Sequence, residues 1–229
     1  MITVPRSTLP STLYKYFAPE RVDIIPYLQV RFSPPSDFND AFDTHHLLPR
    51  TSGGKAKVAR DSLRTNLGVF CLTEQADNHL MWVNYARSHT GFVLGFKADT
   101  PFFDQDGRTL RKVVYQSTPP VFSTPDENGC FYKSPDWKYE KEWRCVRSFS
   151  ESESRLVEIE PTFITEIIFG HLMEPGNIAY ITWYAKAHEM NPTFSKSSPS
   201  HSHWKFVNKP KRVAPCEHCS GQGFLMDDP

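Results

Sequence analysis

The sequence predicts an α+β fold: a mixed, mainly antiparallel sheet with a few interspersed helices, followed by a C-terminal tail. Three observations lead to this prediction. Short runs rich in aromatic and β-branched residues outnumber the stretches with helical spacing. The helices fall between strands without the regular alternation of layered α/β proteins. The chain has 229 residues, 39% of them hydrophobic, which is enough for one core of ordinary size.

The first half of the chain begins with a strand and a short helix. Residues 12–17 (TLYKYF) carry aromatic side chains that favour strands, and Pro19 with Glu20 suits the start of a helix that continues over 23–27. Residues 29–33 alternate polar and apolar side chains and stop at two prolines, after which a loop rich in Asp, Asn and Pro begins. The remaining elements of this half are a helix over 55–67, a buried strand over 68–73 and an amphipathic helix over 77–88.

The second half continues with strands and one long helix. His89, Thr90 and Gly91 break the preceding helix, and an apolar run over 92–96 follows as a strand. Gly170 ends a strand over 166–169. The other elements that we expect are strands over 110–115, 142–147, 155–159 and 204–207, and a helix over 178–190.

Composition narrows the class of protein. The 26 basic and 26 acidic residues cancel, which argues against a protein that coats nucleic acid and against an acidic disordered chain. Of the five cysteines, only Cys216 and Cys219 are close together, a pattern typical of reduced thiols. The sequence lacks the basic start and apolar run of a signal peptide, and no stretch approaches the ~18 apolar residues of a membrane span. We therefore expect a cytoplasmic protein without membrane contact.

The last part of the chain, residues 191–229, differs in composition from residues 1–190, which we expect to form the α+β domain. No acidic residue lies between Glu189 and Glu217, whereas five lysine and arginine residues lie in that interval. The net charge of zero therefore conceals a basic segment between Glu189 and Glu217. This basic tail is a candidate contact for nucleic acid or for a protein partner.

The tail also contains a candidate metal site. His201 and His203, with Cys216 and Cys219, supply four ligands of the type that tetrahedral zinc takes. Residues 216–223 resemble one half-site of the paired zinc-binding repeats in DnaJ-type co-chaperones. The alternatives to a small zinc knuckle are a flexible tail with two spare thiols and a half-site completed by another chain.

The compact motifs of several large enzyme classes are missing. The chain has no GxGxxG, no GxxxxGK[ST], no HExxH and no GxSxG. Eleven glycines in the whole chain leave few for phosphate-binding loops. A nucleotide site would therefore depend on side chains.

Four segments, in this order along the chain, carry a resemblance to a known family. They are 13–16 (LYKY), 32–43 (FSPPSDFNDAFD), 70–92 (which contains FCLTE and MWVNYARSHTGF) and 137–144 (WKYEKEWR). Together they resemble the DUF2971 family of mostly bacterial proteins of unassigned function, over about residues 12–185. The family pattern has Pro at the position of Ala41 and Ser at that of Thr73, and the basic tail lies outside it.

The order of a strand with aromatic and basic residues, a strand ending in a hydroxyl residue and a Glu-rich strand is similar to that of ADP-ribosyltransferases. This likeness implies that Thr73 ends the middle strand, and that Glu140 and Glu142 form an ExE-like pair acting on the nicotinamide ribose of NAD. A carboxylate beneath the ribose would stabilise the positive charge that develops as the glycosidic bond breaks. The residues that would hold NAD by stacking or by charge are Tyr14, Lys15, Tyr16, Tyr85 and Arg144.

The resemblance implies NAD as the cofactor, a nucleotide or nucleic-acid-linked substrate, and a role in bacterial systems of phage defence or in toxin systems. Two other functions stay open. In the first, the chain is a non-enzymatic binding or interaction module, and the charges of residues 140–144 are solvated along an edge strand. In the second, Asp126, Asp136 and Lys138 form the metal-and-lysine set of a metal-dependent nuclease.

Overall fold

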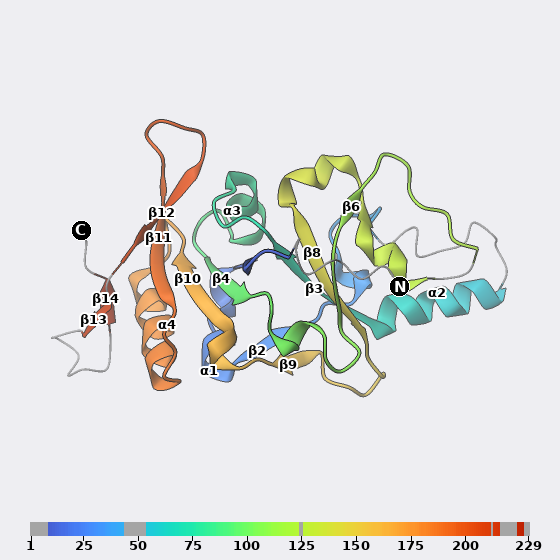
Figure 1. The fold of residues 1–229 in the computed structure, drawn as a ribbon, viewed down its shortest axis with the longest axis horizontal. Helices are drawn as coiled ribbons and strands as arrows, with labels where there is room; N and C mark the ends of the chain where they lie inside the picture. The colour runs from blue at the N-terminus through green and yellow to red at the C-terminus, as the bar shows by residue number, and fades with distance from the viewer. Residues whose placement is uncertain (1–8, 44–53, 124–125, 212, 216–223, 227–229) are drawn as a thin grey trace. The chain divides into compact units, whose positions relative to one another are not determined.

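The computed structural model describes residues 9–43, 54–123, 126–211, 213–215 and 224–226. It confirms the predicted α+β class, with one large mixed sheet that is mostly antiparallel, several two-stranded sheets and few helices (Figure 1). No helix in these residues is both long enough and apolar enough to cross a membrane. The large sheet has eight strands in the order β12 (Phe206–Pro210), β11 (Thr193–Pro199), β10 (Ile164–Phe169), β4 (Phe92–Lys97), β1 (Thr12–Phe17), β3 (Leu67–Thr73), β8 (Glu142–Ser148) and β5 (Thr109–Lys112).

The chain forms two compact units, each built from segments that alternate with those of the other along the sequence. The functional features described below lie within one unit or within the other. The first unit consists of Met1–Leu9, Arg31–Leu72 and Asp99–Val157, and the second consists of Pro10–Val30, Thr73–Ala98 and Glu158–Pro229.

In the second unit, β1 pairs antiparallel with β4 along its whole length, and β4 pairs antiparallel with β10. The strand predicted over residues 12–17 is thus confirmed. Leu13, Tyr16 and Phe17 are buried, as expected for aromatic and aliphatic side chains of an inner strand. Two short helices, α1 (Ile24–Tyr27) and α3 (His79–Tyr85), also belong to this unit, and the side chain of Asn78 caps α3 by accepting from two backbone amides.

The break after α3 is a left-handed stretch of backbone. Arg87, Ser88 and His89 have φ of 44°, 52° and 70°. The carbonyl of His89 accepts from the amide of Leu172, and a Cβ on Gly170 would lie 2.1 Å from that carbonyl oxygen. Glycine is therefore required at position 170 by close approach of two backbone segments.

Helix α4 (Pro175–Ala187) connects β10 to β11, and these two strands are parallel, as expected for a helical crossover. The predicted helix over 178–190 exists but starts three residues earlier, at Pro175. Proline is favoured there because its missing amide would have no partner in the first turn.

Strand β11 was not predicted from the sequence. Its buried positions are Ser195 and Ser197, so the strand lacks the apolar alternation that marks a half-buried strand. The strand expected over 204–207 is β12, which begins at Phe206. Trp204 belongs to the turn that precedes it.

Part of the predicted C-terminal tail joins the large sheet. Strand β11 pairs with β10, and β12 pairs antiparallel with β11 from Ser195↔Pro210 to Pro199↔Phe206. The sheet therefore continues through Pro210. Farther along, β13 (Val213–Pro215) and β14 (Phe224–Met226) form a two-stranded antiparallel sheet.

The first unit contains the other end of the large sheet together with α2 (Gly54–Asn66), which was predicted over 55–67. Strand β5 pairs antiparallel with β8. The strand predicted over 110–115 corresponds to β5 and to β6 (Val114–Tyr115). The segment that follows contains the 3-10 helix η6 (Glu127–Phe131), β7 (Tyr132–Lys133) and the 3-10 helix η7 (Pro135–Glu140), none of which was predicted. Elsewhere, β2 (Gln29–Arg31) and β9 (Leu156–Glu158) form a further two-stranded sheet.

Candidate functional site: a pocket beside a buried ion network

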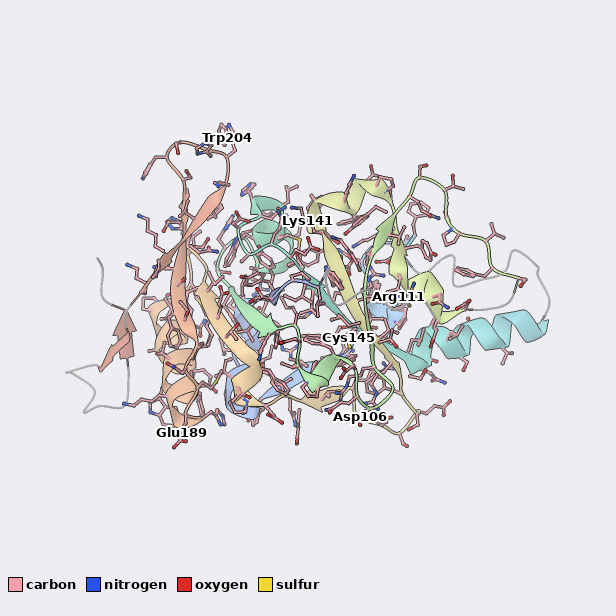
Figure 2. The ribbon with its side chains drawn as sticks, in the orientation of Figure 1. Asp106, Arg111, Lys141, Cys145, Glu189 and Trp204 are labelled. Atoms are coloured by element: carbon pink, nitrogen blue, oxygen red, sulfur yellow. The ribbon has the colours of Figure 1, made fainter. Side chains whose placement is uncertain are left out.

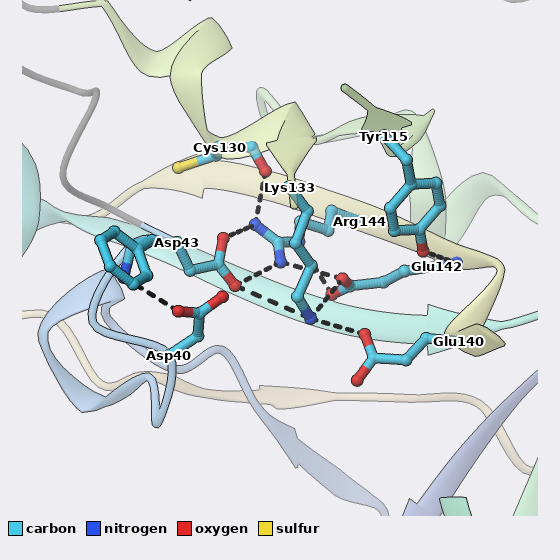
Figure 3. A network of polar contacts seen from close by, with 9 residues as sticks. Asp40, Asp43, Tyr115, Cys130, Lys133, Glu140, Glu142 and Arg144 are labelled. Carbon is cyan, nitrogen blue, oxygen red and sulfur yellow. Dashed lines mark hydrogen bonds and ion pairs between the residues drawn. The ribbon is translucent and has the colours of Figure 1, made fainter. Parts of the chain in front are cut away.

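Arg144, on β8, is the centre of a buried ion network in the first unit (Figure 3). Its side chain is 1% exposed. The two terminal nitrogens of its guanidinium donate to the two carboxylate oxygens of Asp43, each at 2.7 Å, and Nη1 also donates to the carbonyl of Cys130 at 2.6 Å. Nε and Nη2 donate to the carboxylate of Glu142 at 2.8 and 2.9 Å. Such paired contacts give an arginine both charge compensation and a fixed orientation.

Lys133 supplies the second positive charge of this network. Its Nζ donates to Glu140 Oε2 at 2.5 Å and to Glu142 Oε2 at 3.2 Å, and it lies 3.9 Å from Asp43 Oδ2. All of these side chains are at most 6% exposed. A charge buried to this degree is tolerated only when it is paired and hydrogen-bonded.

The local backbone explains how two glutamates reach one lysine. Glu140 ends the 3-10 helix η7, Lys141 has the left-handed φ of 44°, and Glu142 begins β8. The amide of Glu142 donates to the hydroxyl of Tyr115 at 2.8 Å. The expectation that both glutamates lie on one strand is therefore wrong, because the turn at Lys141, and not strand alternation, directs them to Lys133.

The charges of the network shift the pKa values of Glu142 and Lys133. Burial alone would raise the pKa of Glu142, but the positive charges of Arg144 and Lys133, with hydrogen bonds from Arg144 and Cys71, lower it to about 2. Burial opposes the charged form of Lys133, yet the neighbouring carboxylates raise its pKa above the ordinary value. Glu142 and Lys133 are therefore expected to be charged at neutral pH. The network as a whole places three carboxyl groups beside two cationic side chains.

These contacts overturn one interpretation of the segment 140–144. Glu142 and Arg144 are 4% and 1% exposed, and β5 lies outside β8 in the sheet. The charges are thus buried partners on an inner strand and not solvated charges on an edge strand.

A pocket of about 640 Å³ lies beside this network, within the first unit. Its lining combines aromatic rings and prolines with a few polar groups, and Lys133 belongs both to the lining and to the network. The lining residues are Asp40, Phe42, Gln116, Ser117, Pro119, Pro120, Tyr132, Lys133, Ser134, Asp136, Trp137 and Tyr139.

Two acidic residues of the lining differ in their hydrogen bonding. Asp136 accepts from the hydroxyl of Ser134 at 2.8 Å. Asp40 Oδ1 accepts from the amide of Phe42 at 2.9 Å, whereas Asp40 Oδ2 is buried and has no partner among the described residues. A buried carboxylate oxygen without a hydrogen-bond donor has lost its hydration without compensation, unless a ligand or a water molecule donates to it.

The other residues predicted to hold NAD lie in the second unit. Tyr14 is the cross-strand partner of Thr73, and its hydroxyl donates to Glu166 Oε1 at 3.0 Å. Thr73 Oγ1 accepts from the amide of Gln75 at 3.1 Å. The hydroxyl of Tyr16 donates to the carbonyl of Gln75, and the ring of Tyr16 packs edge-on against Trp82.

The last two of these residues are Lys15 and Tyr85. Lys15 Nζ lies 5.8 Å from the ring centre of Phe17. Tyr85 is half-buried in α3.

The structure thus brings together Glu140, Glu142 and Arg144 in the first unit, and Tyr14 with Thr73 in the second. Sequence reasoning missed Lys133, because a single lysine between predicted elements carries no periodic signal. Asp43 belongs to the acidic segment 32–43, whose cluster of Asp and Asn indicates either a functional loop or a loop held by Asx-turn capping.

The predicted metal sites are only partly described. His201 and His203 are exposed in the turn between β11 and β12, and Cys216 and Cys219 lie outside the described residues. No group of three or more His, Cys, Asp or Glu side chains in the described part of the chain is arranged to hold a metal ion. Zinc binding by the tail stays a prediction.

The residues of the nuclease alternative have local roles. Asp126 caps η6 by accepting from the amide of Asn128 at 2.8 Å, and Asp136 is bonded to Ser134. Metal-dependent nuclease activity stays a prediction.

Comparison with known proteins yields no relative. No family model, no curated protein and no solved structure matches this chain. The functional argument therefore rests on the residues of the site.

Proposed function

We propose that the first unit is a binding module whose pocket holds a small molecule with a flat heteroaromatic ring that donates hydrogen bonds. The observation that carries this proposal is the unpartnered Asp40 Oδ2 among the aromatic walls of the pocket. A ring N–H or amide donor would satisfy that oxygen, and stacking on Trp137 or Tyr139 would supply apolar contact. The pocket volume of about 640 Å³ is typical of small-molecule sites.

The charges around the pocket favour binding of a neutral or cationic ring over binding of a phosphate group. The network beneath Lys133 contains three carboxylates and two cations, so the positive charge of Lys133 is already compensated. Asp40 and Asp136 add negative charge to the lining. An anion inside the pocket would therefore be repelled.

The test is calorimetric titration with nicotinamide, adenosine and AMP. We expect at least one of the two neutral ring compounds to bind more tightly than AMP, and Asp40→Ala to weaken that binding by about tenfold, the effect of leaving a ligand donor unpaired. Glu127→Gln, which removes an exposed charge outside the lining, is the control and should leave binding unchanged. Equal binding by wild type and Asp40→Ala would contradict the proposal, as would the absence of binding by all three probes.

ADP-ribosyl transfer from NAD is the second candidate function, and one observation favours it. Lys133 lines the pocket and contacts both Glu140 and Glu142, so the predicted pair of carboxylates lies one side chain away from a ring bound there. The glycosidic C–N bond of NAD would break with its electron pair leaving on the nicotinamide nitrogen, while a nucleophilic oxygen or nitrogen of the acceptor attacks the ribose carbon. Glu140 would take the proton of the acceptor.

In that reaction the pyrophosphate of NAD would lie outside the pocket, where Lys138 and Lys141 are exposed. Membership in the DUF2971 family, a nucleic-acid-linked acceptor and a role in bacterial defence or toxin systems belong to the same proposal.

Mass spectrometry after incubation with NAD tests the transferase candidate. We expect released nicotinamide from the wild type and a loss of at least about tenfold in Glu140→Gln and in Glu142→Gln. Glu140→Gln is the sharper variant, because Glu142 continues to compensate Lys133. Unchanged NAD in the presence of folded wild-type protein would contradict the transferase and leave the binding proposal standing.

A further inference from the structure

The hairpin formed by β11 and β12 ends in an unusually exposed aromatic side chain. Trp204 lies in the turn and is fully exposed, at 103% of its reference area (Figure 2). The turn is closed by backbone hydrogen bonds from Ser200 to Lys205 and from Lys205 to His203. An indole is costly to leave entirely in water, so a fully exposed one marks a contact surface when other features agree.

The hairpin is also positively charged. Lys196 and Lys209 are direct cross-strand partners, and Lys205 follows Trp204. Within the described residues, none of these three lysines takes part in an ion pair, and the sequence contains no acid between Glu189 and Glu217. Like charges directly opposite each other destabilise a pair of strands, and an anion between them would remove that repulsion.

The two faces of the hairpin have different environments. Residues opposite each other share a face, so Lys196 and Lys209 lie on the same side as the pair Ser198 and Val207. The other face contains the buried Ser197 and also Phe206, whose ring stacks on His89 with centres 4.4 Å apart. The contacts of Phe206 and Ser197 hold the hairpin against its own unit. On the lysine face Lys209 and Val207 are exposed and Lys196 is half-buried.

We propose that this hairpin binds a single strand of nucleic acid, with one base stacked on Trp204 and backbone phosphates placed along Lys196, Lys205 and Lys209. An exposed aromatic ring beside a row of cations is the combination that single-strand binding uses. A duplex hides the faces of its bases, so it offers Trp204 no ring on which to stack.

The composition of the turn favours this partner over a membrane. The residues around Trp204 are serines, histidines and Lys205, and none of them is an apolar side chain that would enter a bilayer. The contact is independent of the pocket in the first unit, because all of its residues belong to the second unit.

The test is fluorescence anisotropy with the full chain and a labelled twelve-nucleotide oligothymidylate, over a range of salt concentrations. Three phosphate contacts predict a slope of log affinity against log salt of about −2. Trp204→Ala should weaken binding at least about fivefold with an unchanged slope, since it removes only stacking. Trp204→Phe should restore most of the loss, and oligouridylate should bind like the DNA strand.

The lysines predict a different signature. Lys196→Gln with Lys209→Gln should reduce the salt slope by about 1.4. Lys97→Gln with Lys112→Gln removes the same charge outside the hairpin and should leave the slope unchanged. Absence of oligonucleotide binding would overturn the proposal, as would equal affinity for duplex and single strand or an unchanged affinity in Trp204→Ala. Binding to vesicles that contain phosphatidylserine, lost in Trp204→Ala while the oligonucleotide does not bind, would assign the hairpin to a membrane surface instead.

Discussion

Arg144→Ala is expected to destabilise the protein by roughly 3–5 kcal/mol, a large part of the stability of a typical domain. The substitution leaves Asp43 and Glu142 buried without the guanidinium that each of them contacts twice. It also removes the donor to the carbonyl of Cys130. The measurement is urea unfolding of the full chain, followed by circular dichroism.

A matched control is Arg31→Ala. Arg31 pairs with Asp37 at 2.7 Å, but both side chains are more than 40% exposed, so the loss should be at most about 1 kcal/mol. Arg144→Lys separates charge from geometry, because lysine keeps the positive charge and lacks the paired donors. An Arg144→Ala protein that unfolds at the same urea concentration as the wild type would contradict the assigned role of the network.

Acid is expected to remove a part of the stability that depends on Glu142. In the folded protein the pKa of Glu142 is lowered to about 2 from its ordinary value of 4.5. A carboxyl with a depressed pKa stabilises the folded state fully above its ordinary value, and this contribution is lost as the pH falls from about 4.5 toward 2. Urea midpoints of the wild type should therefore fall over that range.

Glu142→Gln tests the assignment of this pH dependence. The variant should be less stable near pH 7 and should lose less stability between pH 5 and pH 3 than the wild type, because it has no proton to gain at this position. Glu153→Gln, which removes an exposed carboxylate that pairs with Arg147, should keep the profile of the wild type. Parallel profiles of Glu142→Gln and the wild type would show that other groups cause the acid effect.

The elements that the sequence predicted well are those with a clear signal in their side chains. Residues 12–17 carry the aromatic rings that favour strands, and the strand has those bounds. Strand β11 was not predicted because its buried positions are Ser195 and Ser197. Buried serines do not give the alternation of apolar residues by which a strand is recognised in a sequence. Trp204 was placed at the start of a strand, although the chain turns there.

The site was predictable only in part. Glu140, Glu142 and Arg144 were selected, but their alternation with Lys141 is also typical of a solvated strand, and no local pattern distinguishes the two environments. The distinction depends on Asp43 and Lys133, which come from other segments, and on the left-handed conformation of Lys141. The pocket likewise gathers residues from several segments of the first unit, so its walls could not be inferred from spacing.

The pairing of Arg144 with Asp43 joins residues 101 positions apart, and it has a consequence for how the chain is made. The first unit needs residues up to Val157, and the residues Thr73–Ala98, which belong to the second unit, are synthesised before that point. Until Arg144 has been synthesised, Asp43 lacks the guanidinium with which it pairs, and neither unit is one uninterrupted stretch of the sequence. Contacts between such distant residues form slowly because a long loop must close first. We therefore expect chains that end before Arg144 to be substrates for chaperones and proteases, whereas a chain that extends past Val157 can form the first unit.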